Sequence, residues 1–178
     1  MMLIIMSTLR GLDQNFECAE KHLEFAIENN HEILEKLDYL EDDDKKAEFL
    51  ELITKVNQAL RQVYSTILEF KVQIKGLLLS EEKDAQKIKE TLHYIKRNVS
   101  ILRRKLRISR KAYQQLKEYC LEKKLTSDEE SKIFWDAMLG EIADGRGNIY
   151  AAEKHLTEIV LDVEKRLKGL EGGKNNEK

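Results

Sequence analysis

The residues with the clearest chemical potential form a basic segment near the middle of the sequence. From residue 91 to residue 117 there are nine lysines and arginines and no acidic residue. Ammonium and guanidinium groups bind the phosphates of nucleic acids and anionic lipids, and also the carboxylates of a protein partner. The candidate contacts for a polyanion or a partner are Lys96, Arg97, Arg103, Arg104, Lys105, Arg107, Arg110 and Lys111.

The spacing of the cations offers a second interpretation. Four of them, together with the preceding Lys89, recur every seven residues, each directly after a position of the expected core-facing repeat: Lys89, Lys96, Arg103, Arg110 and Lys117. Such a row flanks a helix–helix seam and commonly forms ion pairs across it. Residues 128–164 hold ten acidic and three basic residues and would run antiparallel beside the row. Internal ion pairing and an external polyanion therefore both remain open. Further round the helix lie five cations, more than one flanking helix could easily neutralise: Arg97, Arg104, Lys105, Arg107 and Lys111. They favour an external ligand, although no groove-reading motif or aromatic platform indicates sequence-specific readout.

Two Glu-x-x-His pairs have the spacing that di-iron four-helix bundles use, namely Glu28 with His31 and Glu90 with His93. A carboxylate-bridged metal needs these side chains to converge in the core. The apolar repeat instead directs Glu90 to solvent and places both histidines beside the seam. The sequence also lacks a Gly-rich phosphate loop, a nucleophile elbow and a metal-type Cys/His cluster. We therefore expect no metal, no cofactor and no catalytic residue.

Composition indicates which elements carry these residues. The chain has 178 residues, of which 42% are hydrophobic and 36% charged, and it contains no proline and only eight glycines. Few positions can stop a helix, and the high charge content is typical of long, thin helices. The predicted fold class is all-α, an elongated antiparallel four-helix bundle with coiled-coil-like packing.

The spacing of apolar residues predicts four helices in one domain over residues 1–170, followed by a disordered tail over 171–178. The expected helices span residues 7–40, 45–79, 81–124 and 127–169. The second has nine apolar seam positions, from Phe49 to Leu77, with further apolar residues on both flanks. We expect it to be buried on more than one side and to lie at the centre of the bundle.

Local signals predict the helix ends and two irregular positions. Ser80 is the expected N-cap of the third helix, and Ser127 with Glu130 forms a capping box for the fourth. Gly145 predicts either one helix with a weak or kinked centre or two shorter helices, and the unbroken phase of the seam favours one helix. Asn30 is a polar residue in the first seam, and it either fixes register from a buried position or turns to solvent.

Whole-chain features limit the environment. The net charge of −2 gives no global attraction for polyanions. Cys18 and Cys120 have no metal-type spacing and are expected to be buried free thiols in a reducing compartment. The apolar residues 1–6 form too short a stretch for a signal peptide or a membrane span. We therefore expect a cytoplasmic location, and we expect Trp135, which falls on the seam, to be a core residue.

Together these features predict a non-enzymatic protein that binds another protein or a second copy of itself, as a scaffold or homodimer. The alternative is a polyanion binder that engages nucleic acid or an anionic membrane surface through the basic segment. No small-molecule substrate is evident from the sequence.

Overall fold

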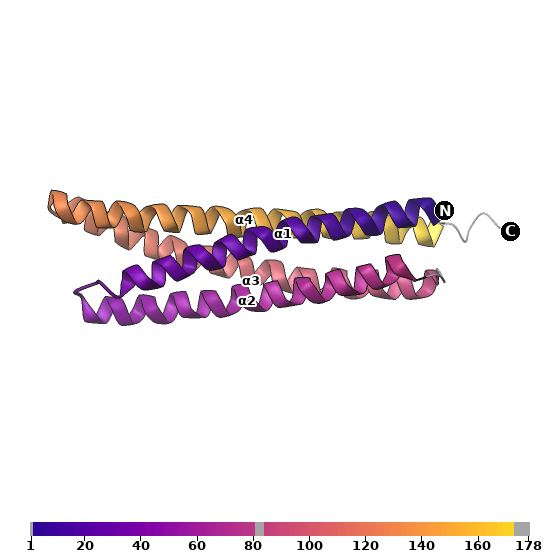
Figure 1. The fold of residues 1–178 in the computed structure, drawn as a ribbon, viewed down its shortest axis with the longest axis horizontal. Coiled ribbons are helices and arrows are strands. Elements are labelled where there is room, and N and C mark those ends of the chain that lie inside the picture. Colours follow the sequence, from indigo (N-terminus) through magenta and orange to yellow (C-terminus); the bar gives the residue numbers. More distant parts are fainter. Residues whose placement is uncertain (1, 81–83, 173–178) are drawn as a thin grey trace.

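The computed structural model confirms the all-α prediction, and it describes residues 2–80 and 84–172. The helices are α1 (Met2–Leu37), α2 (Asp43–Leu79), α3 (Ala85–Thr126) and α4 (Glu129–Gly172). Figure 1 shows them side by side along one long axis, with the start of α1 and the end of α4 at the same end of the molecule.

The helices form a square bundle in which consecutive helices are neighbours and α4 closes back onto α1. Among the described residues, no Cα of α1 lies within 8 Å of a Cα of α3, and the same holds for α2 and α4. The prediction that the second helix is central was therefore wrong. Its broad apolar surface has another explanation: Leu50, Leu52 and Leu78 on its flanks are partly buried against the core, as a corner helix with two neighbours requires.

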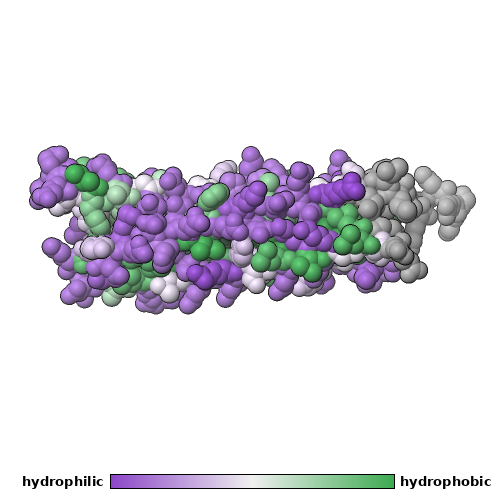
Figure 2. Space-filling view, viewed as in Figure 1, coloured by the Kyte–Doolittle hydropathy of each residue, from purple (hydrophilic) through white to green (hydrophobic). Residues whose placement is uncertain are grey.

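The core is built from the predicted seam positions. All nine seam residues of α2, from Phe49 to Leu77, are buried, and so are the ten of α3, from Ile88 to Cys120. Burying one leucine or isoleucine side chain contributes about 1.5–3 kcal/mol, so these rows supply most of the driving force. The face of the bundle seen in Figure 2 is mostly hydrophilic, and hydrophobic side chains reach the surface there in separate groups.

The N-terminus of α3 is capped differently from the prediction. Asp84, not Ser80, is the N-cap, and its Oδ1 accepts hydrogen bonds from the backbone N–H groups of Gln86 at 2.9 Å and Lys87 at 3.3 Å. The Ser80 N–H instead donates to the Gly76 carbonyl at 3.1 Å and so ends α2. Both side chains can cap a helix, and sequence alone did not distinguish them.

The predicted capping box of α4 was also wrong. Asp128 Oδ1 accepts from the Ser131 N–H at 2.8 Å, whereas the Ser127 hydroxyl donates to the Lys123 carbonyl at 2.6 Å and satisfies the end of α3. Ser127 Oγ also accepts a hydrogen bond from Trp135 Nε1 at 3.1 Å. Trp135 is only 9% exposed, which confirms that it is a core residue.

The outer ends of α1 and α4 extend beyond their predicted limits. Helix α1 begins at Met2 and ends at Leu37, where the Leu40 N–H bonds to the Leu37 carbonyl at 3.1 Å in a closing turn. Helix α4 continues to Gly172, so the first two residues of the expected disordered tail are helical. Residues 173–178 lie outside the described residues.

Helix α4 runs without interruption through Gly145, as the phase of its seam favoured. The glycine is required by close approach, since no glycine among the described residues has a positive φ. A Cβ atom at position 145 would lie 3.2 Å from Asn29 Cβ on α1 and 3.2 Å from Tyr113 Cε2 on α3. The absent side chain therefore makes room for the Tyr113 ring in the middle of the bundle.

Asn30 is fully buried, so it does not turn to solvent. The Tyr113 hydroxyl donates to Asn30 Oδ1 at 2.7 Å, across the diagonal between α3 and α1. Asn30 Nδ2 donates to the Ile53 carbonyl of α2 at 3.4 Å. Together with Gly145 of α4, these groups form one layer to which every helix contributes, and we call it the central layer.

Candidate interaction surfaces

Some cations of α3 are neutralised inside the fold. They lie on the side of α3 that faces α4, and they form ion pairs with acidic residues of α4. Lys89 and Lys96 pair with Glu171 and Glu164 at 3.5 and 3.0 Å. A step of seven along α3 is thus matched by a step of seven back along α4, as in a regular antiparallel seam. The internal-pairing interpretation therefore holds for these residues.

Glu153 of α4 is the strongest acidic partner of α3. Arg107 Nε donates to its Oε1 at 2.7 Å, and Arg110 Nη2 lies 2.8 Å from its Oε2. The Glu153 side chain is only 9% exposed, so two arginines balance one largely buried carboxylate. The Arg110 guanidinium also lies over the Tyr150 ring, 5.1 Å from its centroid, in cation–π geometry.

The outward face of α3 carries cations that the fold does not neutralise. Arg97, Arg104 and Lys111 are exposed, and they form no ion pair or hydrogen bond with any residue in the described ranges. They recur every seven residues, which corresponds to about 10.5 Å along a helix. We call this set the basic row.

The two remaining predicted cations lie at the sides of α3. Arg103 is half-buried on the side of α4, and its Nε atom is buried without a hydrogen-bond partner. Lys105 faces α2, where its Nζ donates to Gln62 Oε1 at 2.7 Å. The eight predicted site residues therefore lie on three faces of α3 and do not form one contiguous site.

A second row on α3 escaped the sequence analysis. Tyr94, Ile101 and Ile108 are 40%, 56% and 59% exposed, although each is a large hydrophobic side chain. We call them the apolar row. Each precedes a member of the basic row by three residues, and residues three apart are neighbours on a helix surface. Their seven-residue spacing is visible in the sequence, but it lies outside the seam positions from which burial was predicted.

On the opposite side of α4, a ladder of polar side chains joins it to α1. His22 Nδ1 lies 3.0 Å from Asn148 Oδ1, and Asn148 Nδ2 donates to Asn29 Oδ1 at 3.2 Å. Asn29 Nδ2 in turn donates to Glu141 Oε2 at 3.0 Å. The two amides on this side are therefore satisfied by each other and by His22 and Glu141, unlike the cations of the basic row.

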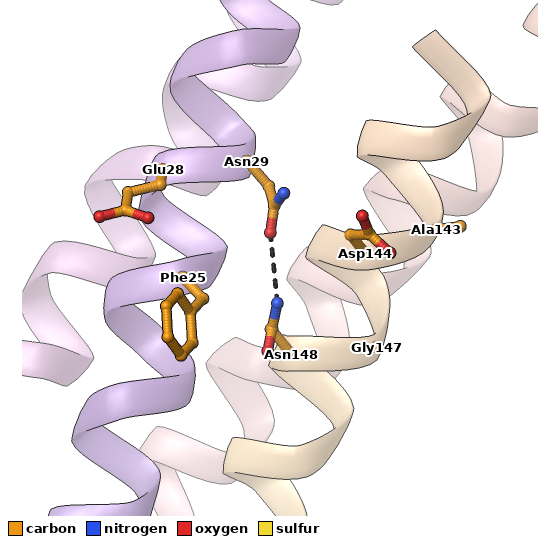
Figure 3. Close-up of a pocket in the computed structure, with 7 residues that line it drawn as sticks. All are labelled: Phe25, Glu28, Asn29, Ala143, Asp144, Gly147 and Asn148. Carbon is orange, nitrogen blue, oxygen red and sulfur yellow. Dashed lines mark hydrogen bonds between the residues drawn. The ribbon is translucent and has the colours of Figure 1, made fainter. Parts of the chain in front are cut away.

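A shallow groove of about 430 Å³ lies beside this ladder, between α1 and α4. Figure 3 shows the Asn29–Asn148 hydrogen bond bridging the two helices, with Phe25 on α1 and Gly147 on α4 at the same groove. Glu28 and Asp144 give its rim negative charge. The lining contains no serine, threonine, cysteine, lysine or histidine side chain.

The Glu-x-x-His pairs do not converge on a common point. His31 lies 3.3 Å from Glu35 on the outside of α1, and Glu90 accepts a hydrogen bond from Gln86 on α3. In the described part of the chain, no group of three or more His, Cys, Asp or Glu residues has the geometry to hold a metal ion.

Both cysteines are free, but they differ in burial. Cys120 is buried, as expected, whereas Cys18 is only half-buried on the side of α1. Burial raises the pKa of the Cys120 thiol to about 12, which makes it a poor nucleophile.

Comparison with known proteins found no family model, no curated protein and no solved structure that matches this chain. Within residues 2–80 and 84–172, none of the helices has an apolar stretch of the length that crossing a bilayer requires.

Proposed function

We propose that this chain is a non-enzymatic scaffold that binds a helical segment of a partner protein along the outer face of α3. The supporting observation is the pair of parallel rows on that face, one basic and unpaired, the other apolar and exposed. A cytoplasmic location fits this proposal, since both cysteines are free thiols.

The two rows fit a helix better than they fit other ligands. Both repeat every seven residues, which is the period at which a second helix can stay in register with α3. The apolar row would receive hydrophobic side chains, and the basic row would attract acidic residues beside them. The chemistry of α3 therefore selects a partner helix with an apolar seam flanked by glutamate or aspartate.

A polyanion is the second candidate ligand. Five predicted site residues have no acidic partner in the described part of the chain: Arg97, Arg103, Arg104, Lys105 and Lys111. A nucleic acid would use these cations and leave the apolar row in water, whereas an anionic membrane surface would use both rows. The apolar row therefore favours the helical partner over nucleic acid.

The test is binding of a synthetic helix of about four heptads, with a leucine seam flanked by glutamates. Fluorescence anisotropy measures its affinity for the wild type, for Ile101→Ser/Ile108→Ser and for Arg97→Glu/Arg104→Glu. We expect each double variant to weaken binding by at least about tenfold. Lys165→Glu/Lys168→Glu, an equal charge change at exposed, unpaired positions of α4, should leave the affinity unchanged.

A DNA duplex and vesicles containing phosphatidylserine are measured in parallel at about 50 and 200 mM salt. Peptide affinity that neither double variant changes would overturn the proposed function. Salt-sensitive duplex binding that only Arg97→Glu/Arg104→Glu abolishes would support the polyanion alternative. Sedimentation at micromolar concentration tests whether the partner is a second copy, because a mass equal to one chain counts against a homodimer.

A further inference from the structure

A groove between α3 and α4 brings three cations together. Its volume is about 310 Å³, and it is lined by Arg110 and Lys117 of α3 and by Arg146 of α4, with Tyr150 beside them. No acidic residue is among its lining residues. The groove lies on the side of α3 that faces α4, away from the basic row.

The register of the two helices places no acid opposite Lys117. Lys89 pairs with Glu171 and Lys96 with Glu164, and three further steps of seven lead from Lys96 to Lys117 on α3 and from Glu164 to Ala143 on α4. Arg146 lies about one turn from Ala143 on α4, so a second cation lines the groove beside Lys117. Two cations without an acid between them repel each other.

These charges are not balanced within the fold. In the described ranges, neither Lys117 nor Arg146 has an acidic oxygen within 4.0 Å. Arg110 adds positive potential beside them, since it shares Glu153 with Arg107 and its own Nε is buried without a hydrogen-bond partner. The groove is thus lined by cations that the fold does not fully balance.

The groove is also open. Ala143 and Gly147 line it from α4, and a Cβ atom added at Gly147 would meet nothing within 4 Å. Small residues on α4 therefore leave open space in the groove beside Lys117 and Arg146.

We propose that this groove binds the phosphate group of a small soluble molecule, held by Lys117 and Arg146 from opposite helices. A phosphate monoester carries a charge of about −1.5 to −2 at pH 7 and so balances two cations, whereas a carboxylate balances one. Arginine presents a planar fork of donors that suits phosphate oxygens, and lysine adds a point charge. This site is separate from the proposed partner surface and does not depend on it.

Thermal unfolding of the full chain in phosphate-free, low-salt buffer tests the site, with inorganic phosphate as the probe. Sodium chloride at equal ionic strength controls for screening. At about ten times the dissociation constant from calorimetric titration, phosphate should raise Tm by about 3–6 °C more than chloride does. Lys117→Gln and Arg146→Gln should each abolish this excess, whereas Lys154→Gln, at an exposed, unpaired position of α4, should retain it.

A second readout comes from the same variants without phosphate. Because Lys117 and Arg146 repel each other in the empty groove, Arg146→Gln should have a higher Tm than the wild type. Three results would overturn the proposal: no excess effect of phosphate over chloride, an equal effect in Arg146→Gln, or a lower Tm for that variant in phosphate-free buffer. An equal shift with succinate would reassign the groove to carboxylates.

Discussion

The central layer and the basic row use polar side chains in opposite ways. In the central layer, Asn30 and Tyr113 are fully buried and bonded to each other across the bundle. In the basic row, Arg97 and Arg104 are exposed and have no partner in the described part of the chain. A buried polar group without a partner costs folding free energy, whereas an exposed cation keeps its water. The first region therefore determines how the helices assemble, and the second remains free to bind.

The largest effect that distinguishes the two regions is expected for Tyr113→Phe. The change leaves Asn30 Oδ1 buried without its hydroxyl donor, so it should lower the free energy of unfolding by about 2–3 kcal/mol. Urea denaturation measures the loss. Tyr150→Phe is the matched control, because that hydroxyl has no hydrogen-bond partner among the described residues, and it should change stability by less than about 0.5 kcal/mol. Equal losses of stability in the two variants would contradict the stabilising role of the buried Tyr113–Asn30 hydrogen bond.

Glu153 combines features of both regions, since its side chain is largely buried and it forms ion pairs with Arg107 and Arg110. Glu153→Gln removes the charge that balances Arg107 and Arg110, and it should cost about 1–2 kcal/mol of stability. Glu164→Gln is the comparison, because its 3.0 Å pair with Lys96 is about 40% exposed on both sides. Exposed pairs contribute little, so we expect a loss below about 0.5 kcal/mol. A Glu164→Gln loss as large as that of Glu153→Gln would show that burial does not control these ion pairs.

Gly145 and Gly147, about one half-turn apart on α4, compare the packed central layer with an open surface position. Gly147→Ala should raise stability by up to about 1 kcal/mol, since alanine favours the helix and its Cβ meets nothing. Gly145→Ala has the same helical advantage, but its Cβ crowds Asn29 and Tyr113 at 3.2 Å, so we expect a net loss of about 1 kcal/mol. Thermal unfolding of both variants gives the signs, and a stabilising Gly145→Ala would show that the central layer yields easily.

The repeating core was predictable, and the contacts between repeats were not. Each seam residue follows from its spacing along one helix, so helix number, order and burial could be read from the sequence. The Tyr113–Asn30 bond joins residues 83 positions apart, and it depends on how diagonal helices align. Sequence showed that Asn30 was exceptional but not that a tyrosine would meet it, and it gave no reason for Gly145.

The surface residues show the same difference: their position on one helix could be predicted, whereas their contacts with other helices could not. Helical geometry predicted five cations further round α3, and three of them, Arg97, Arg104 and Lys111, are exposed without a partner in the described part of the chain. The other two have partners inside the fold, since Arg107 donates to Glu153 and Lys105 to Gln62. The choice between Glu153 and another acid as the partner of Arg107 required the register of α3 against α4, which no single helix encodes. The helix caps failed for a different reason: serine and aspartate are both good N-caps, and Asp84 and Asp128 stood close to the predicted serines.

The smallest predicted effect concerns pH and applies to the interior alone. Burial raises the pKa of the Cys120 thiol to about 12, whereas an unfolded cysteine ionises near about 8.5. As pH rises above about 8, the unfolded chain loses this proton while the native chain keeps it, so native stability falls. By pH 9 the loss reaches about 0.8 kcal/mol. Cys120→Val has no thiol to ionise. Between pH 7 and pH 9, its free energy of unfolding should therefore fall by about 0.8 kcal/mol less than that of the wild type. Urea denaturation under reducing conditions measures both decreases. An identical decrease in both proteins would mean that the thiol gains water before the bundle unfolds, and that the core beside α4 opens more readily than its burial indicates.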